Sequence, residues 1–282
     1  MPELPEVETV TTALNIAIKN LIVKKVSIYR KDLRFPIPKD MSIILPGTKV
    51  IKVKRRAKYG IIDFNNFYSI IFHLGMSGRI IIEKKIFSHL QKHDHIVLEF
   101  KKNTKSNEEI RVIYRDPRRF GFMYLHKTKS IDYKNIFKNL GPEPLNTKFS
   151  VINFIRNIKN KNTSIKSALL DQKIIAGLGN IYICESLFLS GILPMRLCKA
   201  LSRKDIEFLY FNIVKVLKVA IKQGGTSLKD YKNITGEIGY FQNFLCVYNR
   251  NGKECVNKNC TSNVKRIIQN GRSSFYCQNC QK

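Results

Sequence analysis

The sequence contains little negative charge. Asp and Glu together number 21, against 50 Lys and Arg, and the formal net charge at pH 7 is +29. A balance this basic is typical of proteins that bind nucleic acid or another polyanionic surface. Part of it reflects a composition rich in Lys, Ile and Asn, as in proteins from A·T-rich genomes. Hydrophobic residues still make up 44% of the 282 residues, which excludes a disordered tail and allows about two domains with cores of their own.

The sequence also lacks a secretory signal and a charge-free apolar run. The first residues are acidic and have neither a basic n-region nor an apolar h-region. The longest apolar stretch, residues 174–193, contains Asn180 and Glu185. One acidic side chain near a bilayer centre costs about 3 kcal/mol, so this stretch predicts a buried helix of a soluble protein rather than a membrane span.

The cysteines do not form a complete set of pairs, because there are seven of them. An odd number disfavours a framework made only of disulfides, and we predict a reducing compartment. Four cysteines form two close pairs near the C-terminus: Cys255, Cys260, Cys277 and Cys280. Four thiolates with this spacing bind Zn²⁺ tetrahedrally, and so short and polar a segment has little core without metal. We therefore predict one structural Zn²⁺ per chain and assign Cys184, Cys198 and Cys246, which lie in apolar surroundings, to the core.

The chain opens "MPELPEVETV", which predicts a helix with an unusual start. Proline suits a first helical turn, and carboxylates there complement the helix dipole, so the stretch could be a helix start and nothing more. Apolar residues recur at helical spacing from Pro5 to about Leu21, and Glu3 and Glu6 fall on the same row. Glu8 falls among polar residues instead. Two carboxylates on the apolar row predict a partly desolvated pocket at the helix start.

Short β-rich runs follow between residues 24 and 126, separated by turn-forming residues. Their length and spacing predict an antiparallel sandwich or barrel. In "VIKVKRRAK", alternation places Lys52, Lys54, Arg56 and Lys58 on one strand face. Such a basic stripe is either a solvated face or a track for phosphates.

A proline-rich break at residues 141–149 leads into a helical region. The segment "SRKDIEFLYFNIVKVLKVAIKQGG" predicts a helix with Ser202 as N-cap and Gly224 or Gly225 as C-cap. Before it, "IIAGLGNIYICESLF" predicts a glycine turn that leads into another helix. Helices joined in this way are similar to a helix-turn-helix arrangement, which alone is a weak signal.

In combination, these stretches resemble the formamidopyrimidine-DNA glycosylases of bacterial base-excision repair over nearly the whole chain. The matching segments, in order, are "PELPEVE", "RRAKY", "HLGMSG", "KHDH", "DPRRFG", "LGPEPL", "GLGNIY", "QGGTSLKDY" and "FYCQNCQK". The resemblance implies an α+β protein with three parts and DNA in the cleft between domains. Residues 1–133 would form a catalytic antiparallel β-sandwich with an N-terminal helix, residues 134–235 a helix-two-turn-helix DNA-binding domain, and residues 236–282 a β-hairpin zinc finger.

The resemblance also implies the chemistry. In the family the start methionine is removed and the exposed proline nitrogen is the nucleophile, which assigns Pro2. A secondary amine attacking the deoxyribose C1′ gives an iminium that cannot lose its charge through an N–H, and this cation is the electron sink for strand-cleaving β- and δ-elimination. Glu3 would supply the proton that opens the sugar ring, a role suited to a carboxyl whose pKa is raised by desolvation. Lys58 and Arg272 complete the implied catalytic set through contacts with the phosphates, and Glu6 supports the pocket.

Further residues match DNA-contacting positions of the family. They are His73, His93, Lys166 and Asn180, with Arg119 holding a phosphate. Because a glycosylase takes the damaged base out of the stack, side chains must fill the gap, and the resemblance assigns Met76, Arg118 and Phe120 to this role. Taken without the resemblance, "DPRRFG" is a basic turn with one core aromatic residue.

The sequence departs from the family at the first cysteine pair, which is separated by four residues instead of the usual two. The segment "TSLKDYKNITGEIGYF" corresponds to a lesion-facing loop that varies within the family, so the preference among lesions stays open. Two alternatives remain: an endonuclease VIII-like glycosylase for oxidised pyrimidines, or a catalytically silent binder of damaged DNA. The predicted partner is duplex DNA with oxidised bases, without a membrane, and the predicted state is a cytoplasmic monomer.

Overall fold

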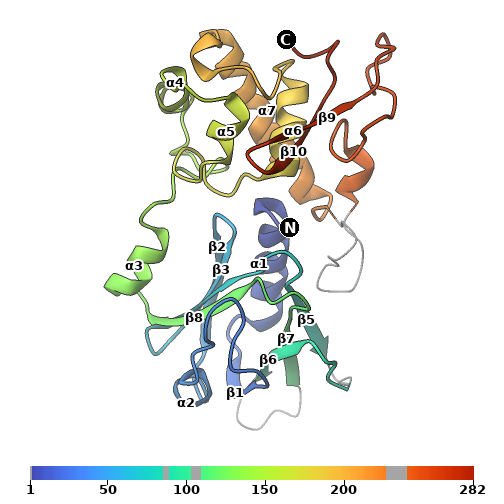
Figure 1. Ribbon diagram of the computed structural model, residues 1–282. Coiled ribbons are helices and arrows are strands. Elements are labelled where there is room, and N and C mark those ends of the chain that lie inside the picture. The colour runs from blue at the N-terminus through green and yellow to red at the C-terminus, as the bar shows by residue number, and fades with distance from the viewer. Residues whose placement is uncertain (1, 85–88, 103–108, 227–239) are drawn as a thin grey trace. The chain divides into compact units, whose positions relative to one another are not determined.

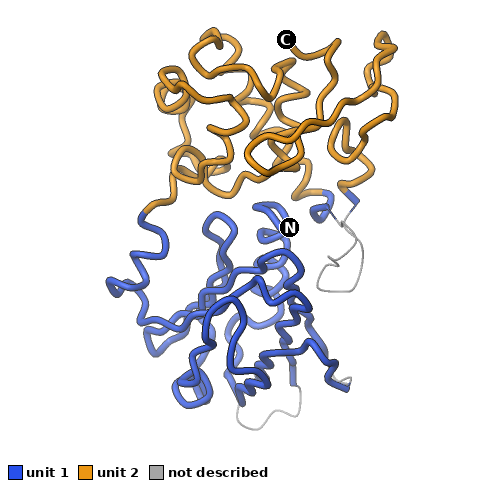
Figure 2. Tube along the Cα trace, viewed as in Figure 1, with its two compact units in different colours: residues 1–138, 223–240 blue, residues 139–222, 241–282 orange. Residues whose placement is uncertain are grey.

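The computed structural model describes residues 2–84, 89–102, 109–226 and 240–282 (Figure 1). The chain divides into two compact units (Figure 2). The first comprises Met1–Lys138 and Gln223–Tyr240, and the second comprises Asn139–Lys222 and Phe241–Lys282. The division into parts at 1–133, 134–235 and 236–282 stays a prediction.

Two antiparallel four-stranded sheets form the first unit. Their strand orders are β1-β6-β7-β5 and β2-β3-β4-β8. The strands are β1 (Ile22–Ile28), β2 (Val50–Arg56), β3 (Tyr59–Phe64), β4 (Tyr68–His73), β5 (Arg79–Lys84), β6 (Asp94–Lys101), β7 (Glu109–Arg115) and β8 (Phe122–Lys127). Helices α1 (Leu4–Ile18), α2 (Met41–Ile44) and α3 (Ile131–Phe137) complete the described part of this unit.

Apolar side chains from both sheets and from α1 share one buried core. On α1 the buried positions include Val7, Val10, Leu14 and Ile18, which is the stripe that helical spacing predicts. The antiparallel sandwich with an N-terminal helix is therefore confirmed. Because α1 packs against β2 and β3, the core fixes the start of this helix beside the sheet that carries Lys58 and His73.

The prediction that Lys58 shares one strand face with Lys52, Lys54 and Arg56 is wrong. Strand β2 ends at Arg56, and Ala57 adopts φ +52°, so Lys58 lies in the turn before β3. A register shift between Val50 and Lys52 also interrupts the ladder with β3. Lys58 is consequently buried, whereas Lys52 is exposed on the strand.

Helices dominate the second unit. They are α4 (Val151–Lys159), α5 (Ile165–Leu170), α6 (Asn180–Leu189), η1 (Cys198–Ala200), α7 (Arg203–Lys222) and η2 (Phe241–Phe244). Helix α7 begins as predicted, because the backbone N–H of Asp205 donates to Ser202 Oγ at 3.1 Å. Helix α6 packs against α5, α7 and the C-terminal hairpin, which makes it the centre of the unit. Among the described residues, no helix is both long and apolar enough to cross a membrane.

The C-terminal hairpin pairs β9 (Lys265–Gln269) with β10 (Arg272–Tyr276). Its two-residue turn has left-handed backbone angles, with φ +49° at Asn270 and +70° at Gly271. Asn-Gly is the sequence that a turn of this hand favours, because its twist matches that of the strands. The turn thus sets the register in which Arg272 faces Gln269.

Gly60 marks a close approach in the sandwich core. It pairs with Phe72 across β3 and β4, and a Cβ at this position would lie 2.0 Å from Phe72 Cζ. Gly60→Ala therefore overpacks the core and should lower the free energy of unfolding by about 1–3 kcal/mol, measured by urea denaturation. In a Phe72→Leu background the same change should cost less, because the ring atoms that it meets are gone. An equal cost in both backgrounds would contradict the steric explanation.

Candidate functional site

The start of α1 places three buried polar or nucleophilic groups together. Pro2, Glu3 and Glu6 are all buried, with Glu3 2% and Glu6 1% exposed. The Glu3 backbone N–H donates to Glu6 Oε2 at 2.8 Å, which ties the residue before the helix to its first turn. Glu8, by contrast, is partly exposed and pairs with Arg55. The predicted desolvation of Glu3 and Glu6, but not of Glu8, is confirmed.

Glu6 also contacts a segment more than 200 positions away. Its Oε1 accepts the backbone N–H of Thr226 at 2.8 Å, and a Cβ at Gly225 would lie 3.0 Å from the same oxygen. One carboxylate thus holds both the helix start and the residues that lead into the predicted lesion-facing loop. Residues 227–239 of that segment lie outside the described residues.

His73 is the last residue of β4 and lies close enough to Lys58 to feel its charge. Its ring stacks on Phe122 with centroids 5.2 Å apart and planes 7° apart, and it meets Tyr59 edge-on. The Gly75 N–H donates to His73 Nδ1 at 2.9 Å, so the ring in this arrangement is neutral, with its hydrogen on Nε2. Burial lowers the pKa of His73 to about 4, and the charges of Lys58 and Arg34 act in the same direction.

Two adjacent loops of the first unit carry the residues that, by the resemblance, fill the space left in the duplex by the extruded base. Met76, 38% exposed, lies between β4 and β5. Arg118, Arg119 and Phe120 lie between β7 and β8, and the Arg118 guanidinium carbon lies 4.9 Å from the centroid of the Phe120 ring. Phe120 is 46% exposed, so the alternative that it is a core residue is wrong. His93 is half-buried and lies close by, because its carbonyl accepts the N–H of the residue that follows β7.

In the second unit, Lys166 and Asn180 both bind the hairpin backbone. Lys166 is 1% exposed, and its Nζ donates to Ser273 O at 2.7 Å and to Ser274 Oγ at 2.6 Å. Asn180 Nδ2 donates to the same carbonyl of Ser273 at 2.9 Å. Burial lowers the pKa of Lys166, and the nearby Arg272 guanidinium lowers it further. These contacts fix the strand that begins at Arg272, whose own side chain is exposed.

One polar atom of the Asn180 side chain accepts no hydrogen bond from the described residues. Its Oδ1 is buried and has no hydrogen-bond partner within the described part of the chain. A buried acceptor without a donor is costly, and a donor from a ligand or water would satisfy it. Asn180 is also the first residue of α6, where the helix leaves backbone N–H groups that suit a phosphate.

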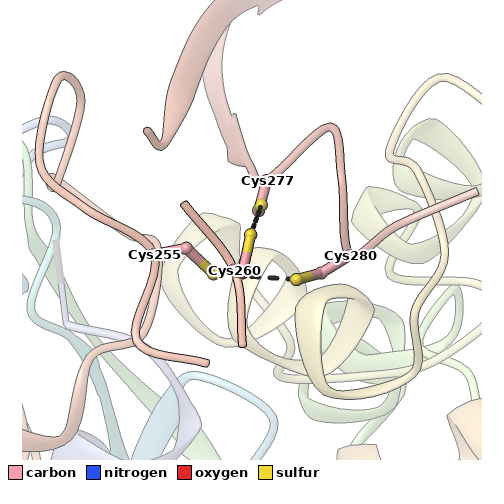
Figure 3. A group of neighbouring side chains, drawn as sticks. All are labelled: Cys255, Cys260, Cys277 and Cys280. Atoms are coloured by element: carbon pink, nitrogen blue, oxygen red, sulfur yellow. Dashed lines mark hydrogen bonds between the residues drawn. The ribbon is translucent and has the colours of Figure 1, made fainter. Parts of the chain in front are cut away.

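The four C-terminal cysteines form one cluster. Their Sγ atoms all lie within 4.8 Å of one another, and the side chains point toward a common centre (Figure 3). The Sγ atoms of Cys255 and Cys280 are 3.7 Å apart, and those of Cys260 and Cys277 are 3.6 Å apart. Four sulfurs around one tetrahedral Zn²⁺, with Zn–S bonds of about 2.3 Å, lie about 3.8 Å apart. The cluster therefore fits a metal ion, and the four-residue spacer of the first pair is compatible with it.

Glu185 makes a structural contact that the sequence patterns did not identify. It is 2% exposed on α6, and its carboxylate accepts backbone N–H groups from Cys246, Val247 and Tyr248 at 2.7–3.0 Å. Burial raises the pKa of Glu185, while these three donors lower it. An acidic residue inside an apolar helix was the available signal, because such a carboxylate must be paired when buried.

The described side chains thus form two groups, one in each unit. Pro2, Glu3, Glu6, Lys58, His73, Met76, His93, Arg118, Arg119 and Phe120 belong to the first, and Lys166, Asn180, Arg272 and the cysteine cluster to the second. Their assignment to catalysis and DNA contacts stays a prediction.

Comparison with known proteins gives consistent matches. A family model described as the formamidopyrimidine-DNA glycosylase N-terminal domain matches residues 1–123, and one described as the H2TH domain of the same enzymes matches residues 140–232. The chain is 43% identical over 289 residues to a formamidopyrimidine-DNA glycosylase of Roseobacter denitrificans and 44% identical over 290 residues to one of Dinoroseobacter shibae. All of this chain and all of each relative are covered.

Solved structures agree over the same length. The Lactococcus lactis Fpg in complex with abasic-site DNA is similar with a TM-score of 0.88 and 30% identity, over 100% of both chains. A MutM structure in complex with DNA that contains carbocyclic 8-oxo-G is similar with a TM-score of 0.88 and 31% identity, again over 100% of both chains.

The low pKa of His73 predicts a specific pH dependence of stability. The unfolded chain takes up this proton near pH 6.5, whereas the folded chain does so only near pH 4. The free energy of unfolding is therefore unaffected by this group above about pH 6.5. As the pH falls from there toward 4, it decreases by up to about 3 kcal/mol, because the unfolded chain binds the proton more tightly. In urea unfolding without DNA, His73→Gln should flatten the decline between these pH values. If the free energy of unfolding declines equally in the wild-type protein and in His73→Gln, the pH dependence does not come from His73.

Proposed function

Because the chain belongs to the formamidopyrimidine-DNA glycosylase family, we propose that it excises oxidised purines from duplex DNA and then cleaves the strand at the resulting abasic site. The observation that carries the proposal is the pair of buried carboxylates at the start of α1, next to Pro2. The substrates would be 8-oxoguanine and ring-opened purines.

Pro2 and Glu3 would carry out the first chemical steps. With Met1 removed, the Pro2 nitrogen attacks C1′ of the damaged nucleotide while the bond from C1′ to the base breaks, and the base leaves with a proton. Glu3 donates a proton to the sugar ring oxygen, which opens the ring and leaves an iminium on the Pro2 nitrogen. The iminium then accepts electrons as C2′ loses a proton and the 3′-phosphate leaves in the β-elimination. In the δ-elimination C4′ loses a proton and the 5′-phosphate leaves. Glu6 holds the Glu3 backbone during these steps through the 2.8 Å hydrogen bond.

Several cations would hold the DNA backbone. Lys58, in the turn before β3, and Arg119 would contact phosphates from the first unit, with His73 and His93 nearby. Arg272 and Asn180 would do so from the second unit, where an exposed guanidinium and the start of α6 both offer N–H donors. Lys166 is bound to the hairpin carbonyl, so its main contribution would be to place Arg272.

Met76, Arg118 and Phe120 would fill the space that the extruded nucleotide leaves. Extrusion costs a few kcal/mol, and an inserted side chain offsets part of this cost. The exposure of Met76 and Phe120 on neighbouring loops supports this role.

The cysteine cluster would hold one structural Zn²⁺ through Cys255, Cys260, Cys277 and Cys280. The ion would fix the ends of the hairpin that presents Arg272, and it would take no part in the chemistry. We further infer that the protein acts as a monomer on DNA in the cytoplasm of a bacterium.

Covalent trapping tests the nucleophile. With a duplex that contains 8-oxoguanine, borohydride reduction should join the DNA to the Pro2 nitrogen, because reduction converts the iminium into a stable amine. Peptide mapping by mass spectrometry identifies the joined residue, and the intact mass of the free protein shows whether Met1 is absent. Glu3→Gln should lose base excision while it still binds the lesion duplex.

The outcomes distinguish the alternatives. Trapping at a lysine would overturn the assignment of Pro2, and equal loss of binding and excision in Glu3→Gln would indicate misfolding. Faster cleavage of a thymine glycol duplex than of the 8-oxoguanine duplex would favour the endonuclease VIII-like alternative. Binding without any cleavage would favour a silent binder of damaged DNA.

Metal content tests the cluster. Purified protein should hold one zinc per chain, and Cys277→Ser should lose both the metal and DNA binding, because the hairpin then loses the ion that joins its ends. The unfolding transition of the β-sandwich should remain. Cys246→Ser is the matched control, since this half-buried thiol packs against the apolar base of the hairpin and is not one of the four clustered cysteines. Fully active protein without zinc would refute the proposed role of the metal.

A further inference from the structure

A buried hydrogen bond joins the two loops that carry the proposed gap-filling residues. Asp116 follows β7 directly and is fully buried, and Ser77, one residue after Met76, is 3% exposed. Ser77 Oγ donates to Asp116 Oδ1 at 2.5 Å. The other carboxylate oxygen, Oδ2, accepts the backbone N–H of Gly121 at 2.8 Å. The carboxylate therefore bridges the Met76 loop and the far end of the turn that contains Phe120.

The same serine also holds the near end of that turn. Its Oγ accepts the backbone N–H of Arg118 at 3.1 Å. The Asp116 carbonyl accepts the Arg119 N–H at 3.3 Å, and it lies 2.9 Å from His95 Nε2. The backbone of residues 118, 119 and 121 is thus tied to Ser77 or Asp116 on both sides of Phe120.

The two loops are also in direct steric contact. A Cβ at Gly75 would lie 2.4 Å from both Gly121 N and Phe120 C, and a Cβ at Gly121 would lie 2.6 Å from His73 O. Backbone therefore packs on backbone here, and a small shift of one loop must move the other.

Asp116 makes no ion pair within the described ranges. A buried carboxylate held by one hydroxyl and one backbone N–H contributes little net stability, because apolar residues fill such a site at a lower desolvation cost. The geometry that it imposes is a better explanation for its presence.

We propose that Ser77 and Asp116 are a positioning pair that holds the Met76 loop and the Arg118–Phe120 turn as one rigid wedge, so that their side chains enter the duplex together. The inference rests on the proposed function, because it needs Met76, Arg118 and Phe120 to fill the gap. Without the pair, each loop still reaches the DNA, but the side chains no longer share one fixed spacing.

Single-turnover kinetics of Ser77→Ala test the pair. Excision of 8-oxoguanine from an intact pair should fall about tenfold or more, because displaced groups lose alignment with the stack. Strand cleavage at a preformed abasic site should change less than about threefold, because no base has to be extruded there. Asp116→Asn should lose less than Asp116→Ala, since an amide keeps the shape and can still accept the Gly121 N–H.

Ser69→Ala is the matched control. Ser69 is also fully buried in the first unit, and its Oγ donates to the Asp63 carboxylate at 2.7 Å, at the end of β4 opposite to the Met76 loop. Its loss should lower thermal stability about as much as Ser77→Ala while it leaves the ratio of the two rates unchanged. If both variants lower the two rates equally, the pair is only structural and the proposal is wrong.

A double-mutant cycle with Phe120→Ala separates the pair from the wedge. If Ser77 acts through the alignment of Phe120, Ser77→Ala should add little in the Phe120→Ala background. Fully additive losses in the double variant would overturn the positioning role. So would a Ser77→Ala protein whose ratio of 8-oxoguanine excision to abasic-site cleavage is unchanged, when Phe120→Ala lowers that ratio. In both cases the wedge role of Phe120 would remain. An unchanged ratio in Phe120→Ala itself would refute the wedge, and the positioning pair with it, while the trapping experiment on Pro2 still decides the catalytic assignment.

Discussion

Buried carboxylates that accept backbone N–H groups from loops are the interaction on which this protein depends. Glu6 accepts from residues 3 and 226, Glu185 from residues 246–248, and Asp116 from residue 121. Each carboxylate lies in or beside a helix or strand, and each holds a loop that has no regular partner of its own. Because an unpaired carboxylate in the interior is strongly unfavourable, the loop can leave only at the cost of exposing or neutralising the charge.

The second unit, besides Glu185, also uses a buried cation to hold its hairpin. The Lys166 ammonium and the Asn180 amide converge on the carbonyl of Ser273, and they fix a hairpin whose outer face is mostly polar. Phe275 and Val264 pack with Cys184 and Phe188 of α6, so the hairpin does have a small apolar base. The cysteine cluster closes the ends of the hairpin, while the lysine holds its middle.

The sequence predicted the features that repeat or that have a fixed spacing. The stripe of α1, the cap at Ser202 and the cysteine cluster all follow from local rules, and the structure agrees with them. It did not predict the burial of Lys58, because one residue with positive φ at Ala57 ends the alternation. Nor did it identify Asp116 or Glu185, whose partners are set by the tertiary fold. Periodicity describes one element at a time, whereas a buried polar contact between loops needs the whole fold.

The bond between Ser77 and Asp116 also constrains how related sequences can diverge. The two residues are 39 positions apart, yet replacing either one alone by an apolar residue leaves a buried polar group of the other unsatisfied. If the contact matters for function, a change that removes the polar group at one position is better tolerated when the other position changes too. Among relatives, the donor and the acceptor should therefore vary together, and swaps that keep one hydroxyl and one carboxylate should outnumber single losses.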